Sequence, residues 1–229
     1  MEILSDIPVS LDAGTVLERM NIRKKRGDME KGIQEMIELA LPVAKPKAVY
    51  EVSYIDNKYD DAVDIGGIRF TSRVLRDNLE EANKVFPFVA TCGKEVDRID
   101  IPADEFMKCY FLDQIKEVLL EQAMSHLEEH LTRKFSLGQI SEMEPGSLES
   151  WPIDQQQKLF SIFGNVEELI GVRLTDRYLM VPVKSVSGIY FPTEIKFESC
   201  QLCPREKCIG RKARYDPELA RKYGLVEET

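Results

Sequence analysis

A single long helix is the strongest constraint that this sequence places on its fold. Between about Ala103 and Phe135, an apolar residue recurs at every fourth position. The members of this row are Phe111, Ile115, Leu119, Ala123, Leu127 and Leu131. The rest of the helix is largely charged, so the row forms one narrow apolar stripe that needs a partner surface. We therefore expect this helix to lie across a β-sheet.

Strand and turn signals surround this helix at unequal spacings. Residues 48–55 alternate like a half-buried strand, and Gly66-Gly67 lies between two short alternating runs, which predicts a tight hairpin. Further strands are expected at 85–91, 172–174, 179–181 and 186–191. Shorter helices are expected at 12–21, 28–41, 72–84 and 154–163, and a loop at 138–152. This order favours a mixed α+β fold over a regular alternation of strand and helix.

Charge and motif content argue against several classes of protein. A formal net charge of −9 disfavours a general nucleic-acid-binding surface. No apolar run approaches the roughly 20 residues of a membrane helix, and the first residues do not resemble a signal peptide, so we expect a cytoplasmic protein. The sequence has no phosphate loop, no dinucleotide-binding glycine motif and no Gly-x-Ser-x-Gly elbow, which disfavours a nucleotide-dependent enzyme or a serine hydrolase.

Three of the five cysteines fall within nine residues, at Cys200, Cys203 and Cys208. An odd number of clustered cysteines favours reduced thiols over a disulfide framework. The Cys-x-x-Cys spacing can direct two thiolates at one metal ion, and Cys92, at a predicted strand-to-helix turn, is the candidate fourth ligand. An open fourth position is the alternative. Zinc and an iron–sulfur cluster fit this ligand set equally, and a redox dithiol is a second interpretation.

The cysteines lie in a basic segment of an acidic chain. Residues 196–214 contain six basic and two acidic residues, a local charge of +4, whereas the remainder of the chain carries −13. Such a segment could meet an anion or the acidic surface of a partner protein. It could equally serve only to keep a terminal loop solvated.

The two histidines, His126 and His130, satisfy the His-x-x-Glu-His pattern of some zinc peptidases. They also flank the apolar stripe of the long helix, where amphipathic side chains commonly mark the edge of a packed face. Nothing in the sequence signals the additional carboxylate ligand that such a site needs. We therefore reject the peptidase interpretation.

Several segments, in order, resemble one known family. Leu179-Met-Val-Pro-Val-Lys-Ser-Val-Ser-Gly-Ile-Tyr-Phe191 is similar to the signature strand of the activation domain of cobalamin-dependent methionine synthase. Glu144-Pro-Gly-Ser147, followed by Trp151-Pro152, resembles the Arg-x-x-Pro-Gly-Tyr-Pro loop of that family, and residues 171–175 resemble the step before its strand. The resemblance covers roughly residues 105–195. It implies a bent antiparallel sheet with helices packed around it.

The resemblance also implies a groove for S-adenosylmethionine. Pro145, Gly146 and Tyr190 match positions that line this groove in the family, since glycine permits close approach of a ligand and tyrosine can stack on adenosine. From the long helix, Glu121 could face the same groove.

Two positions depart from the family pattern. The family arginine falls on Glu142, and the tyrosine that follows Pro-Gly falls on Ser147. Both changes remove groups expected to hold the carboxylate and the adenosine of the ligand. The fold and the corrinoid context therefore transfer more strongly than S-adenosylmethionine binding does.

The resemblance implies a stand-alone accessory protein for the reductive activation of a corrinoid- or cobalamin-dependent methyltransferase system. The corrinoid would be carried by a partner protein, and the cysteines would supply or relay an electron. We expect at most an activation or electron-relay component rather than an independent enzyme. The alternatives are a structural zinc-binding interaction protein without redox chemistry and a small-molecule methyltransferase, which the missing glycine-rich loop and Glu142 disfavour.

We expect three segments along the chain. Residues 1–100 would form an N-terminal α/β lobe of the same unit, residues 101–195 the activation-domain-like core, and residues 196–229 a Cys-rich basic tail.

Overall fold

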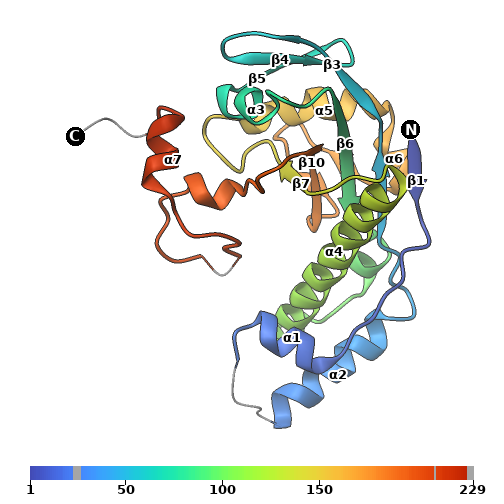
Figure 1. Cartoon of the computed structure of the whole chain (residues 1–229). Helices are drawn as coiled ribbons and strands as arrows, with labels where there is room; N and C mark the ends of the chain where they lie inside the picture. Colours follow the sequence, from blue (N-terminus) through green and yellow to red (C-terminus); the bar gives the residue numbers. More distant parts are fainter. Residues whose placement is uncertain (23–26, 209, 226–229) are drawn as a thin grey trace.

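Strand β6 (Lys84–Thr91) is the centre of the main sheet of this computed structural model. The structure describes residues 1–22, 27–208 and 210–225. One edge of β6 pairs with β2 (Lys47–Tyr50) and then with β3 (Ser53–Lys58), and β6 also pairs with β10 (Ser185–Pro192). Strand β10 in turn pairs with β7 (Ile140–Met143), and all of these pairings are antiparallel. Strands from the N-terminal and C-terminal halves of the chain thus share one sheet (Figure 1).

The remaining strands extend this sheet or stand beside it. Strand β1 (Glu2–Leu4) pairs with β2, and β3 leads into a meander with β4 (Ala62–Ile65) and β5 (Ile68–Thr71). The predicted Gly66-Gly67 turn joins β4 to β5, and both glycines have positive φ. Within the described residues, eight strands belong to the main sheet, and β8 (Arg173–Leu174) and β9 (Met180–Val181) form a separate pair.

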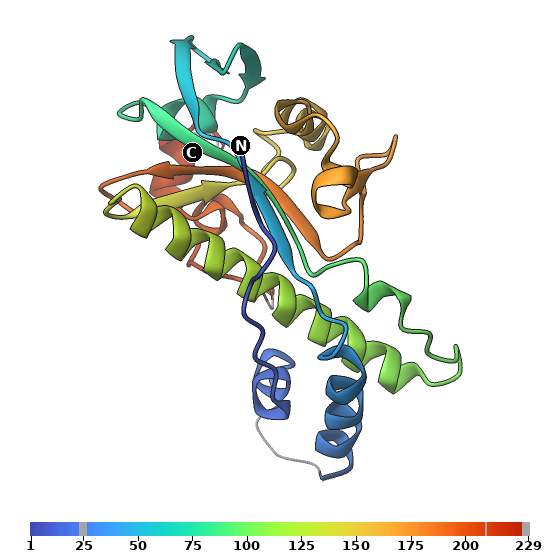
Figure 2. The same ribbon diagram turned by 90° about the vertical axis from the view of Figure 1, so that its right-hand side faces the viewer.

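Helix α4 (Phe106–Lys134) lies along one face of the sheet and extends past its end (Figure 2). Its apolar stripe is buried along its whole length, but it meets two different partners. The C-terminal half packs with Phe86, Phe88 and Tyr190 of the sheet. The N-terminal half packs against α1 (Ala13–Arg19) and α2 (Gly27–Ala40). The prediction that α4 lies across a sheet is therefore confirmed for its C-terminal half.

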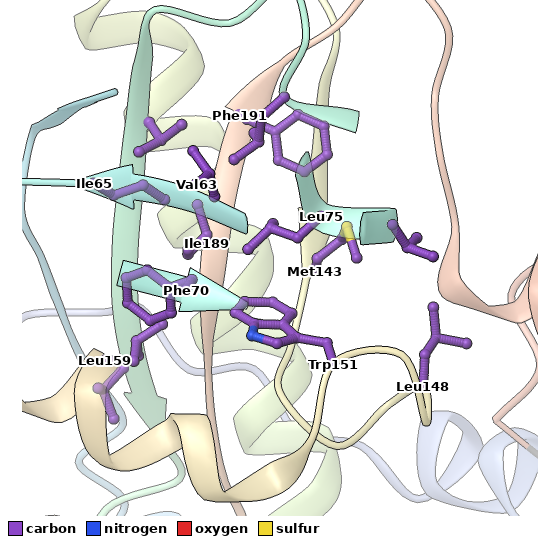
Figure 3. Packing of buried hydrophobic residues seen from close by; sticks show 14 of the residues in the cluster. Val63, Ile65, Phe70, Leu75, Met143, Leu148, Trp151, Leu159, Ile189 and Phe191 are labelled. Carbon is purple, nitrogen blue, oxygen red and sulfur yellow. The ribbon is translucent and has the colours of Figure 1, made fainter. Parts of the chain in front are cut away.

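The opposite face of the sheet carries the largest apolar cluster (Figure 3). It is covered by α3 (Arg73–Asn78), α5 (Gln156–Phe163) and α6 (Val166–Ile170). The ring of Trp151 is fully buried and meets Phe70 edge to face, with 6.2 Å between the ring centroids.

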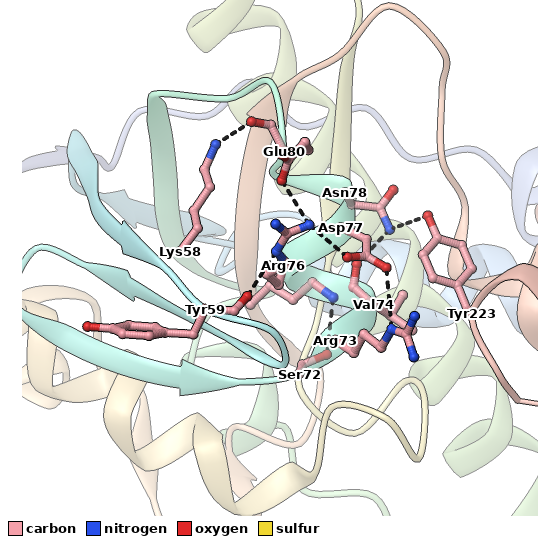
Figure 4. A network of polar contacts seen from close by, with 11 residues as sticks. Lys58, Tyr59, Ser72, Arg73, Val74, Arg76, Asp77, Asn78, Glu80 and Tyr223 are labelled. Carbon is pink, nitrogen blue, oxygen red and sulfur yellow. Dashed lines mark hydrogen bonds and ion pairs between the residues drawn. The ribbon is translucent and has the colours of Figure 1, made fainter.

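The C-terminal segment joins this same cluster. It contains the 3-10 turn η3 (Ser199–Leu202) and helix α7 (Pro217–Lys222), which bring Leu202 and Ala220 into the core. The Nδ2 group of Asn78 in α3 donates a hydrogen bond to the hydroxyl of Tyr223 just after α7, at 3.1 Å. Figure 4 shows this contact beside the ion pairs of α3. The described part of the predicted tail is therefore packed on the body, whereas residues 209 and 226–229 lie outside the described residues.

Three expected elements differ from the structure. The strand expected at 48–55 is divided into β2 and β3, opposite Pro87 of β6. The carbonyl of Pro87 accepts a bond from Glu51 at 3.0 Å, but proline has no N–H to continue the ladder, so the ladder is interrupted here. On both sides of the interruption the partner strand is β6, in one continuous register. The helix expected at 72–84 ends at Asn78 and the chain then enters β6. The loop expected at 138–152 contains β7.

No helix among the described residues is long and apolar enough to cross a membrane.

Candidate functional site

The candidate site is built around a cross-strand pair, Glu142 on β7 and Tyr190 on β10. Tyr190 is 2% exposed, and its ring stacks on Phe88 with 4.6 Å between centroids. Burial raises the pKa of the Tyr190 phenol well above its ordinary value, and the carboxylate of Glu142 raises it further. The phenol therefore stays protonated and is available as a hydrogen-bond donor.

Glu142 is one of several carboxylates gathered here, together with Glu128 of α4, Glu144 after β7 and Glu198 before η3. Burial raises the pKa of Glu144 to about 7, with a further contribution from the charge of Glu142. Burial also raises the pKa of Glu128. Glu144 can therefore gain or lose a proton near neutral pH, and displaced pKa values of this kind often occur at functional sites.

Lys212 supplies the counter-charge to this cluster. Its Nζ lies 2.5 Å from Oε1 of Glu142, whose side chain is 14% exposed. Burial acts to lower the pKa of Lys212, but the carboxylate of Glu142 outweighs it and raises the pKa to about 12. The ammonium group therefore stays charged beside a largely covered carboxylate.

The basic segment around the cysteines is partly bound within the chain. The guanidinium of Arg211 donates hydrogen bonds to the carbonyl oxygens of Cys200 and Cys203, at 3.2 and 3.3 Å. It also donates to the carbonyls of Arg205 and Ala213. Arg211 and Lys212 of this segment are thus engaged within the chain, and contact of the segment with an acidic partner stays a prediction.

The Pro-Gly loop after β7 has a conformation that requires its glycine. Gly146 has φ +88°, and its N–H donates to the carbonyl of Trp151 at 2.7 Å. A Cβ at this position would lie 2.6 Å from Cδ1 of Ile153, so a side chain of the protein already occupies the adjacent space. Pro145 is buried, and Ser147, at the family tyrosine position, donates a 3.0 Å bond to Glu144.

The predicted groove residues face different surroundings. Tyr190 belongs to the cluster on the α4 face, whereas its neighbours Ile189 and Phe191 pack with Trp151 on the opposite face. Glu121 forms an ion pair with Arg19 of α1, which places it beside α1 rather than with Glu142. The structure thus joins Tyr190 to Glu142 but does not bring Glu121 to them. Binding of a ligand by Pro145, Gly146, Tyr190 and Glu121 stays a prediction.

The predicted metal ligands are not assembled. Cys92 is fully buried in the cluster of α1, α2 and α4, and burial raises the pKa of its thiol to about 12, which disfavours the thiolate form that a metal requires. Cys200 and Cys203 lie instead at η3, beside the other core cluster. Across residues 1–22, 27–208 and 210–225, no three His, Cys, Asp or Glu side chains form a group that could hold a metal ion. Cys92 is therefore corrected from a ligand to a core residue, and zinc or an iron–sulfur cluster at Cys200, Cys203 and Cys208 is not supported.

His130 of α4 has a structural setting. Its Nε2 lies 3.2 Å from the hydroxyl of Tyr50 and 3.3 Å from the carboxylate of Glu2. These contacts tie α4 to β1 and β2.

A separate open cavity of about 1100 Å³ lies between α3, the end of β10 and α7. Its lining includes Phe197, Tyr223 and Asp216, and none of Pro145, Gly146 or Tyr190. Glu142, Glu144, Tyr190 and Lys212 thus lie outside this cavity.

Sequence reasoning missed the partners of Glu142. It identified Glu142 only as a departure from the family arginine, and it did not single out Glu128, Glu144 or Lys212. The one available signal was the opposite charge of the residue 196–214 segment and the rest of the chain. That signal predicts attraction, but it does not show which lysine meets which carboxylate.

Comparison with known proteins identifies the fold. Residues 149–202 match the family described as vitamin B12 dependent methionine synthase, activation domain. A solved structure of the MetH reactivation domain bound to AdoHcy is similar, with a TM-score of 0.56 and 15% sequence identity, covering 88% of this chain and 82% of that one. No curated protein matches the sequence. The chain has an α+β fold with an antiparallel sheet, similar to that of the MetH reactivation domain, as the sequence resemblance predicted.

Proposed function

We propose that this chain assists the reductive reactivation of a corrinoid-dependent methyltransferase and binds S-adenosylmethionine near the β7–β10 pair. The observation that carries this proposal is a likeness of fold. It extends over 88% of the chain, and the similar structure is a reactivation domain bound to AdoHcy. The matching family is also defined by dependence on vitamin B12.

The charged side chains of the site match the charged groups of S-adenosylmethionine. S-adenosylmethionine carries a sulfonium and an amino group as well as a carboxylate, and it supplies the methyl group when bound. Glu142 and Glu144 suit the cationic groups, whereas the ammonium of Lys212 suits the carboxylate. Lys212 would then replace the family arginine from a distant part of the sequence, by exchanging its bond to Glu142 for one to the ligand.

The partner would be a protein that carries the corrinoid. Reactivation needs the methyl group, one electron and the corrinoid together. A separate donor would supply the electron. Because all five cysteines are unpaired, a reducing cytoplasmic location fits the chain.

Calorimetric titration of the purified chain with S-adenosylhomocysteine tests the binding step. We expect saturable binding that weakens about tenfold or more in Lys212→Met, the loss of one charge-assisted bond. Lys207→Met removes an exposed lysine of the same segment and serves as the matched control. Equal affinity of the two variants would contradict the role of Lys212.

The reactivation step needs a cobalamin-loaded methyltransferase trapped as cob(II)alamin. With S-adenosylmethionine and titanium(III) citrate present, we expect the chain to accelerate the conversion to methylcobalamin, followed by visible absorbance. No acceleration, together with no binding of S-adenosylhomocysteine, would overturn the proposed function.

A further inference from the structure

Cys200 and Cys203 lie three residues apart on the 3-10 turn η3 and its C-cap. A 3-10 turn has three residues per turn, so side chains at positions i and i+3 eclipse one another. Its rise of about 2 Å per residue separates their Cα atoms by about 6 Å, which is within the roughly 4.4–6.8 Å range of disulfide-bonded cysteines. The N–H of Cys203 donates to the carbonyl of Cys200 at 3.3 Å and holds this turn closed.

The surroundings of Cys200 hold its sulfur in place at the surface of the turn. The backbone N–H of Lys212 donates to Sγ of Cys200 at 3.4 Å. The guanidinium of Arg211 is fixed against the carbonyls of both cysteines, which places a permanent positive charge beside the turn. Both cysteines are partly exposed, so a soluble reagent can reach them.

Two thiols without further ligands suit a covalent bond better than a metal ion. Structural zinc and iron–sulfur sites take about four ligands. In the part of the chain that the structure describes, no third Cys, His, Asp or Glu completes such a set around Cys200 and Cys203. A bond between the two sulfurs needs no additional group.

We propose that Cys200 and Cys203 form a dithiol–disulfide redox pair that exchanges with thiol and disulfide compounds. The Cys200 thiolate attacks one sulfur of a disulfide compound, forms a mixed disulfide and releases one thiolate. The Cys203 thiolate then displaces the second thiolate and closes the Cys200–Cys203 bond. Two protein thiols are oxidised, one disulfide is reduced to two thiols, and the two protons pass to the released thiolates or to solvent.

This pair lies next to the carboxylate cluster. Lys212 contacts both, since its N–H binds Sγ of Cys200 and its ammonium binds Glu142. Oxidation converts the Cys200 thiol, which accepts a hydrogen bond from the Lys212 N–H, into a disulfide sulfur. Oxidation of the pair therefore alters a contact of Lys212, the residue whose ammonium group neutralises Glu142. The redox pair itself does not depend on the proposed function.

The test is oxidation of the full chain in oxygen-free buffers of reduced and oxidised glutathione, followed by alkylation with N-ethylmaleimide and peptide mass spectrometry. Trypsin releases Cys200 and Cys203 together, in residues 197–205, and separates them from Cys208. We expect this peptide to be two hydrogen atoms lighter and not alkylated. Half-oxidation should need about tenfold less oxidised glutathione than modification of the exposed Cys208, because closure of the pair is intramolecular.

Two variants distinguish this pair from independent reactive thiols. Cys203→Ser should leave Cys200 trapped as a glutathione mixed disulfide, whereas Cys208→Ser should form the pair as the natural chain does. Separate glutathione adducts on Cys200 and Cys203 of the natural chain would overturn the proposal. A bond from either cysteine to Cys208 would also overturn it.

Discussion

Glu144 makes the stability of the folded state depend on pH, and one substitution should remove this dependence. Its pKa is raised from an ordinary 4.5 to about 7, first by burial and then by the charge of Glu142. The folded chain therefore binds this proton more tightly than the unfolded chain does. The resulting stability is complete below pH 4.5 and is lost as the pH rises through about 7. Wild-type protein should thus lose stability between pH 5 and pH 8, through the cost of ionising a covered carboxyl group.

The size of this loss follows from the pKa difference. At about 1.4 kcal/mol per pH unit, this difference of about 2.5 pH units sets an upper limit of about 3.5 kcal/mol. The carboxyl group is only partly covered, so solvent screening reduces the expected loss to about 1–2 kcal/mol. Glu144→Gln carries a neutral amide of similar shape that can still accept the bond from Ser147. The variant should match the wild type near pH 4.5 and exceed it by this amount above pH 7.

Urea unfolding at a series of pH values measures the difference, since a change in midpoint without a change in slope reports stability alone. Glu129→Gln is the matched control, because it removes one negative charge from an exposed position of α4. The reasoning is refuted if wild type and Glu144→Gln show the same dependence on pH. It is also refuted if Glu129→Gln reproduces the gain, since the effect would then reflect the net charge of the chain.

Three further substitutions test the packing and the electrostatics of the fold. Gly188→Ala places a Cβ 2.6 Å from a carbonyl oxygen of the neighbouring β7, and it should destabilise the chain by about 1–3 kcal/mol in thermal unfolding. Leu119→Ala removes a fully buried side chain between α4 and the N-terminal helices and should cost about 2–5 kcal/mol, measured by urea unfolding; a cost below 1 kcal/mol would contradict this packing. Burial lowers the pKa of His130, whereas the charge of Glu2 raises it, so Glu2→Gln should lower this pKa further in an NMR titration.

The sequence predicted the elements that depend on local periodicity. The stripe of α4, the short helix α1 within residues 12–21 and the Gly66-Gly67 turn are each encoded within a few residues, and the structure contains all three. The interruption between β2 and β3 was missed, because it depends on which residue of the neighbouring strand lies opposite, here Pro87. Strand β7 was missed for a similar reason. Its four residues lie among loop signals and are fixed by pairing with β10, far away in the sequence.

The candidate site was less predictable than the fold. Tyr190 was identified from a motif, but Lys212 lies 70 residues after Glu142, and only the packing of η3 and α7 brings the two together. Cys92 was assigned to a metal because it follows a strand and precedes a short turn. The same position becomes a core site once α1, α2 and α4 close over it. The cysteine side chain suggested a ligand for a soft metal ion, but the burial of Cys92 favours the protonated thiol, which does not bind metal.

The change from the family arginine to Glu142 alters the charge at β7 without leaving it unbalanced. A carboxylate at 14% exposure beside Glu144 is costly to leave without an oppositely charged partner. Lys212 supplies that partner from a segment whose position depends on η3 and α7. A ligand that takes Lys212 from Glu142 must therefore also offer Glu142 a new positively charged partner. A ligand with both a carboxylate and a cationic group does both, since its carboxylate binds Lys212 and its cationic group binds Glu142. This coupling predicts selectivity for zwitterionic ligands over simple anions. A simple anion would draw Lys212 away and leave Glu142 and Glu144 without compensation.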